Sequence, residues 1–195
     1  LRFTNDDVEE IVLSQDGEHF YVCCFDHHIY VFENNEKPRL IGRIGQFKFQ
    51  VNHLKGVSNN RMLAILESGE AYIISADSNS IVARRGGTSA YWDLIVKDDF
   101  IIGTSESGHL DVYQINSRLR DFTLHKVSQI RPKLKPQRLR ITCIDKENYI
   151  SVGADGVVVK FDRSGNVQWD YRLDGILRDI SLSPCGQKVA VGSEL

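Results

Sequence analysis

The sequence lacks the features that mark several common classes of protein. Its four cysteines show no Cys-x-x-Cys spacing, so it offers neither a zinc-ribbon nor a redox motif. It contains no apolar run long enough to cross a membrane, and no secretory signal is visible. Gly-x-Ser-x-Gly, phosphate-cradling Gly loops and His-Glu-x-x-His are also absent. We therefore predict no catalytic residue, no cofactor-binding residue and no metal ligand.

The cysteines point to a reducing compartment. Cys23 and Cys24 are adjacent on an expected strand, so their side chains point to opposite faces and do not pair with each other. With Cys143 and Cys185 they are expected to be free, buried thiols. A cytoplasmic location is the corresponding prediction.

What the sequence does contain is a short motif that repeats about every 40 residues. Each copy has a short polar turn, a run of β-formers, an aromatic residue or Ile, and then a polar residue. Successive copies are 42, 39 and 48 residues apart. Self-similarity at this period indicates a repeat architecture. The copies occupy residues 26–33, 68–75, 107–114 and 155–162.

The segments around each motif predict four strands per repeat. A short apolar run rich in aromatic or β-branched residues precedes each turn, as in a buried strand. Gly69, Gly108 and Gly156 suit the positive φ of a tight hairpin, and Asp26-His27 is the one copy without glycine. Further strands are expected on both sides, with Ser-x-x-Gly turns at 14–17 and 183–186. Four strands in about 40 residues is the pattern of a β-propeller blade.

The units resemble WD40-type blades. Phe32-Glu33, Tyr113-Gln114 and Phe161-Asp162 stand where that family often has Trp-Asp, and the Ser-x-x-Gly turns resemble its Ser-Pro-Asp-Gly. The chain has no Gly-His pair at the blade starts and no Trp-Asp in the third strands. The side-chain network of typical WD40 blades is therefore expected to be missing. Residues 161–169 are similar to the repeat of quinoprotein-dehydrogenase-like propellers.

The expected fold is all-β, a single partial propeller over residues 1–195 built from four-stranded antiparallel blades. Because the first and last residues align with the interior of a blade, we expect a piece of a longer propeller, with an unusually small ring as the alternative. The expected divisions are an outer strand of a preceding blade at 1–4, blades at 8–44, 48–86, 89–130 and 137–174, and half a blade at 176–195.

Charge is distributed unevenly along the chain. The formal net charge is −2, yet residues 117–140 hold eight of the 24 Lys and Arg residues and one of the 26 acidic residues. This stretch also lengthens the blade at 89–130 as a basic insertion. It is a candidate contact for an acidic protein, a nucleic acid or another polyanion. The alternative is a solvated loop or an outer strand with charged edge residues. The basic residues are Arg118, Arg120, Lys126, Arg131, Lys133, Lys135, Arg138 and Arg140.

Two further features resemble sites, namely Trp92 and the His27-His28 pair. Trp92 starts an inner strand and is either an interaction anchor at a channel mouth or a core residue. His27 and His28 lie beside Asp26, but neighbouring side chains diverge and do not converge on one ion. The leading hypothesis is a non-catalytic scaffold that binds protein partners through its faces and loops. The rivals are a quinoprotein-like dehydrogenase and a nucleic-acid-associated or anion-associated factor using residues 117–140.

Overall fold

The computed structural model describes residues 4, 6–57, 59–86, 91–98, 100–105, 109–116, 123–131, 140–145 and 147–194. Every regular element within these ranges is a β-strand, and there are 18 of them. The chain divides into two compact units. Unit 1 comprises residues 1–90 and 116–123, and unit 2 comprises residues 91–115 and 124–195.

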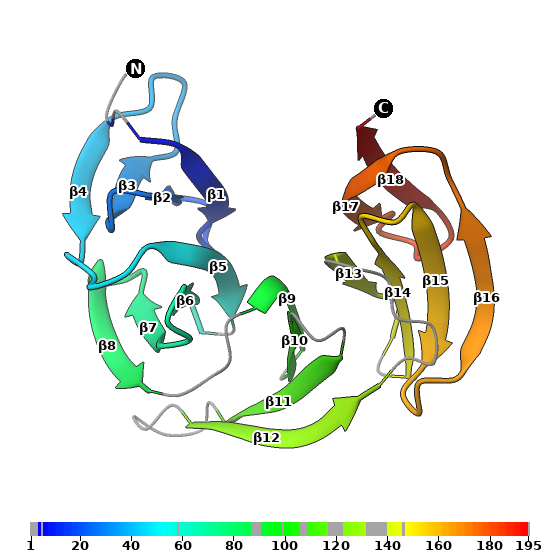
Figure 1. The fold of residues 1–195 in the computed structure, drawn as a ribbon. Coiled ribbons are helices and arrows are strands. Elements are labelled where there is room, and N and C mark those ends of the chain that lie inside the picture. The colour runs from blue at the N-terminus through cyan, green and yellow to red at the C-terminus, as the bar shows by residue number, and fades with distance from the viewer. Residues whose placement is uncertain are drawn as a thin grey trace. The chain divides into compact units, whose positions relative to one another are not determined.

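Unit 1 holds two four-stranded antiparallel sheets, each made of consecutive strands (Figure 1). Sheet A is β1 (Val8–Leu13), β2 (His19–Cys24), β3 (Ile29–Glu33) and β4 (Leu40–Ile44). Sheet B is β5 (Val51–Val57), β6 (Arg61–Leu66), β7 (Ala71–Ser75) and β8 (Ser80–Arg85).

Unit 2 repeats this plan in sheets C and D and adds a two-stranded sheet E. Sheet C is β9 (Tyr91–Lys97), β10 (Phe100–Ser105), β11 (Leu110–Asn116) and β12 (Thr123–Ile130). Sheet D is β13 (Arg140–Cys143), β14 (Asn148–Val152), β15 (Val157–Asp162) and β16 (Val167–Arg172). Sheet E is β17 (Ile176–Leu182) and β18 (Val189–Glu194).

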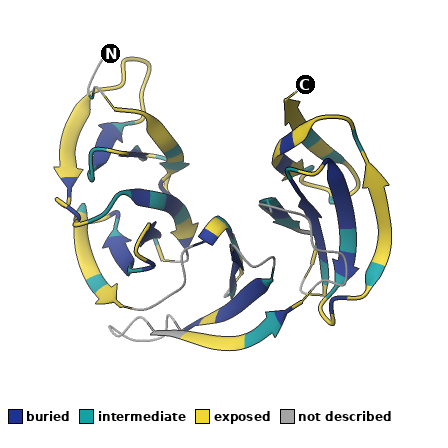
Figure 2. Cartoon of the chain, viewed as in Figure 1, coloured by how far each residue is buried: buried dark blue, intermediate teal, exposed yellow. Residues whose placement is uncertain are grey.

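Burial differs by strand position because the two middle strands pack on both faces. The second and third strands are mostly buried, whereas β4, β8 and β16 are mostly exposed (Figure 2). Strands that are buried on both faces have continuous runs of apolar residues, and the second and third strands show this pattern. The fourth strands carry charged and polar residues at the exposed sheet edge.

The hairpins between second and third strands have the predicted backbone. His27, Gly69 and Gly156 have φ of 69°, 80° and 78°. The positive φ of His27 confirms that histidine replaces glycine at this turn. Gly108 lies outside the described residues.

Neighbouring sheets within a unit share a core. In unit 1, Cys23 and Val31 of sheet A pack with Leu54 and Ile74 of sheet B. In unit 2, one core joins sheets C and D and another joins sheets D and E. The first strands lie next to each other: β1 contacts β5, and β13 contacts both β9 and β17.

The all-β class and the four-stranded antiparallel sheets are confirmed. Part of the expected basic insertion is strand β12, the fourth strand of sheet C, so residues 123–130 correspond to the outer-strand alternative. The expectation of buried thiols is wrong for Cys185, which is exposed, whereas Cys23 and Cys24 are free and buried. The side chain of Cys143 and all of residues 1–3 lie outside the described part.

Candidate interaction surface

The basic segment contributes one ion pair to the interior of sheet C. The Lys126 ammonium lies 2.6 Å from a carboxylate oxygen of Asp111, whose side chain is 1% exposed. The same oxygen accepts a hydrogen bond from the Gln129 amide at 2.9 Å. The Tyr91 hydroxyl reaches the other oxygen at 3.4 Å and also donates to the Tyr113 hydroxyl at 2.7 Å. These contacts form a polar network within unit 2.

The network keeps Asp111 ionised. Burial by itself raises the pKa of this carboxyl, but the hydrogen bonds from Lys126 and Gln129 outweigh burial and hold the pKa below its ordinary value. An ionised carboxylate at this depth needs such partners. Lys126 therefore supports the packing of sheet C, whether or not a partner also contacts it.

The other described basic candidates also contact the chain itself. Arg131 donates to the Gln129 side-chain oxygen at 3.1 and 3.0 Å. Arg140 on β13 donates to the main-chain oxygen of Trp92 on β9 at 2.7 Å. Five members of the basic set lie outside the described residues: Arg118, Arg120, Lys133, Lys135 and Arg138. Their assignment to a partner surface stays a prediction.

Four first strands carry a β-bulge at the same register point. In each, one extra residue stands between two residues that pair with consecutive positions of the second strand. A bulge re-aims the extra side chain and ends regular pairing there. We call these residues the bulge positions: Glu9 and Asn52 in unit 1, and Trp92 and Arg178 in unit 2.

Trp92 is the large aromatic among the bulge positions. Trp92 is 38% exposed, so it is not a fully buried core residue, and its role as an interaction anchor stays a prediction. Its own carbonyl oxygen is held by Arg140, which fixes the backbone at the bulge. A partly exposed Trp is the kind of side chain that anchors protein interfaces.

A carboxylate follows the bulge and binds the next sheet. The Glu10 carboxylate accepts the main-chain N–H of Leu54 on β5 at 2.8 Å and forms an ion pair with Lys55. In unit 2 the Asp93 carboxylate accepts the N–H of Ile141 on β13 at 2.8 Å, and Arg140 lies 4.0 Å away. We call this arrangement the carboxylate clamp.

Sequence reasoning did not find the clamp, although a signal was present. Glu10-Ile11, Asp93-Leu94 and Asp179-Ile180 each place an acid before Ile or Leu on a first strand. This signal can be recognised only once the bulge is known. The extra residue shifts the strand register, and the repeats must be aligned on the shifted register. The clamp joins sheets through charged hydrogen bonds, which are stronger than neutral ones.

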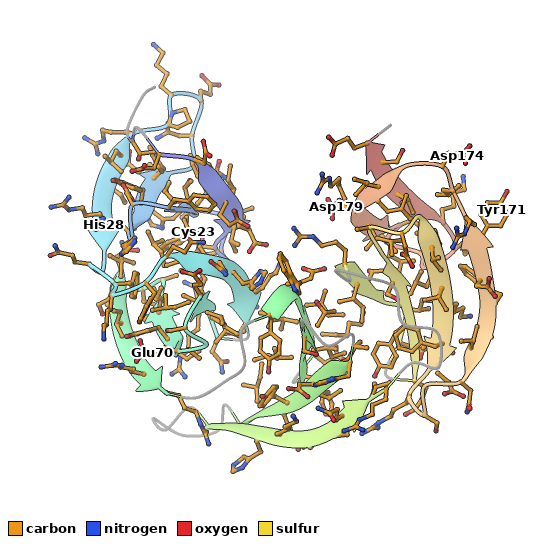
Figure 3. The ribbon with its side chains drawn as sticks, in the orientation of Figure 1. Cys23, His28, Glu70, Tyr171, Asp174 and Asp179 are labelled. Atoms are coloured by element: carbon orange, nitrogen blue, oxygen red, sulfur yellow. The ribbon has the colours of Figure 1, made fainter. Side chains whose placement is uncertain are left out.

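The histidines at the first turn are held by local contacts. A ring nitrogen of His27 lies 3.1 Å from the Phe47 carbonyl oxygen. A ring nitrogen of His28, which Figure 3 labels, lies 2.9 Å from the Asp26 carbonyl oxygen. Among the residues that the structure describes, no group of three or more His, Cys, Asp or Glu side chains is placed to bind a metal ion.

No protein-family model matches the chain, and no curated protein matches it either. In the described ranges, no helix is both long and apolar enough to span a membrane.

Proposed function

We propose that the sheets are blades of a β-propeller and that this propeller is a non-catalytic scaffold for a protein partner. The propeller is supported by the repeated four-stranded sheets and by the contacts between first strands of consecutive sheets within each unit. Radial repetition of such sheets is how propellers protect their edges. The resemblance to WD40-type repeats points the same way.

The bulge positions carry the proposal of partner binding. One structural device, repeated in four first strands, presents four chemically different side chains: an acid, an amide, an indole and a guanidinium. Unlike side chains at a shared, re-aimed backbone position suit partner recognition better than they suit core packing. Trp92 is the proposed anchor, because Trp and Arg dominate binding energy at interfaces.

A protein surface is the proposed partner in preference to a polyanion. Lys126 and Arg140, two of the described basic candidates, bind acceptors of the chain itself. The described bulge positions also include the acid Glu9. A site for nucleic acid would instead need several cations free to meet phosphates.

Site-specific photo-cross-linking tests the proposal with a matched control. Benzoylphenylalanine replaces Trp92 in one variant and Trp169 in another; Trp169 is 43% exposed and lies on the fourth strand β16. Position 92 is expected to trap one defined protein that position 169 does not trap. Trp92→Ala should weaken binding of that protein about 30-fold, the effect of a typical hot spot, and Trp169→Ala should not. Equal trapping at both positions, or none at 92, would remove the proposal.

A further inference from the structure

Asp179 on β17 occupies the position of the clamp carboxylates. It follows the bulge residue Arg178 and pairs in register with Gly192, as Asp93 pairs with Thr104 after the bulge residue Trp92. Glu10 stands at the same point of β1, directly after the bulge residue Glu9.

The side chain of Asp179 already has the conformation that the clamp uses. One oxygen of Asp93 accepts the N–H of the following residue, Leu94, at 2.8 Å, which leaves its second oxygen to bind Ile141. One oxygen of Asp179 likewise accepts the N–H of the following residue, Ile180, at 2.8 Å. Its second oxygen is thereby oriented to accept an N–H as that of Asp93 does, and the residue is exposed on β17 (Figure 3).

Sheet E has one face buried against the preceding sheet and one face that carries the clamp carboxylate. Leu177 and Ile180 face sheet D and are buried with it. Ser181 and Ala190, which pair with each other, are exposed, as is Asp179. This exposed face corresponds to the side of sheet A that packs on sheet B and to the side of sheet C that packs on sheet D.

We infer that the Asp179 face of sheet E docks the first strand of a further sheet of the same polypeptide. The main-chain N–H of that strand binds the free oxygen of Asp179, and the residue next to this N–H is Lys or Arg. The occupant is assigned to the same polypeptide because both clamps join sheets that are consecutive in one chain. The adjacent cation is assigned because Lys55 follows Leu54 and Arg140 precedes Ile141.

β1 does not match this description of the occupant. The residue of β1 that corresponds to Leu54 and Ile141 is Ile11, and its neighbours are Glu10 and Val12. A second copy of the chain that presented β1 would therefore bring an acid to Asp179 where the clamp has a cation. Charge complementarity disfavours that pairing.

Hydrogen exchange of the full-length polypeptide tests the clamp at Asp179. Asp93→Asn is the internal reference and is expected to speed exchange of the Ile141 amide about tenfold or more, as the loss of a hydrogen bond to a charged acceptor predicts. Asp179→Asn is expected to speed exchange to a similar extent in one strand outside residues 1–195. Asp155→Asn, at an exposed turn, is the control and is expected to change neither. No change outside residues 1–195 in Asp179→Asn would overturn the inference.

Cross-linking identifies the occupant. Benzoylphenylalanine at Ser181 is expected to link to a strand of the same polypeptide that contains a Lys or Arg beside the protected amide. A link to a separate polypeptide, or to a strand without that basic residue, would overturn the inference. These outcomes are independent of the Trp92 experiments, so failure here is distinguishable from failure of partner binding.

Discussion

Replacing Lys126 by Met separates its internal role from a role in partner binding. The substitution keeps the aliphatic length and removes the ammonium that lies 2.6 Å from Asp111. The Asp111 carboxylate is 1% exposed and would then keep the Gln129 amide, the weaker Tyr91 contact and the His109 ring 4.0 Å away. Because burial disfavours the charged form, the loss falls on the folded state of sheet C.

The expected cost is about 1–2 kcal/mol. Removing one partner of a fully buried ion pair costs about 3–5 kcal/mol. Lys126 is 45% exposed, and solvent screens its charge. The cost expected for Lys126→Met is therefore the smaller value of about 1–2 kcal/mol. A double-mutant cycle that combines Lys126→Met with Asp111→Asn should show that most of this cost is coupling free energy between the two residues.

The sign of the pH dependence follows from the lowered pKa of Asp111. Its folded-state pKa lies below the ordinary value of an Asp carboxyl, so the carboxylate stabilises the fold above that ordinary value, about pH 4. This contribution is lost as the pH falls through the folded pKa. In Lys126→Met the pKa of Asp111 should rise, because burial then acts with less opposition. Acid unfolding of sheet C should begin at a higher pH in this variant.

Hydrogen exchange of the amides of β10 and β11 is the appropriate assay, because two compact units need not unfold together. A cost of 1–2 kcal/mol speeds exchange by roughly 5–30-fold. Arg131→Met is the matched control, since Arg131 contacts only the neutral Gln129 side chain in the described interactions. Wild-type exchange and an unchanged acid profile in Lys126→Met would refute the internal role.

Two further predictions concern turns and thiols. Gly156→Ala should destabilise unit 2 by about 3 kcal/mol, because φ is 78° and the new Cβ would meet the Leu173 carbonyl oxygen. Gly186→Ala should cost about 1 kcal/mol, because φ is 71° but the new Cβ would meet no atom within 4 Å apart from its chain neighbours. Equal melting shifts in the two variants would contradict this reasoning. Iodoacetamide at pH 8 should modify Cys185, whose pKa is lowered by the Ser183 hydroxyl, and spare Cys23, whose pKa burial raises to about 12. Mass spectrometry reads the sites, and modification of Cys23 at the rate of Cys185 would contradict the burial argument.

The all-β class could be predicted because middle strands and turns have strong local patterns. The apolar runs before each turn and the residues suited to positive φ, including His27, mark the second and third strands directly. β5 was harder to recognise, because Val51–Val57 interrupts its apolar residues with Asn52, Lys55 and Gly56. β12 was also hard to recognise, because Thr123–Ile130 shows no alternating apolar pattern and an edge strand needs none.

The candidate site could be predicted only in part. Trp92 was identified as an unusual aromatic, but its exposure depends on a bulge that no short motif specifies. Lys126 was grouped with its basic neighbours by composition alone. Its contact with Asp111 arises from the pairing of β11 with β12 in one sheet, which sequence spacing does not reveal.

Hydrogen–deuterium exchange of the protein alone and bound to the partner trapped at position 92 tests the central claim most directly. The account predicts protection of the first-strand segments that contain Trp92 and Arg178 in unit 2, with no change in β4, β8 and β16. Protection confined to those outer strands, with the bulge positions unchanged, would contradict it.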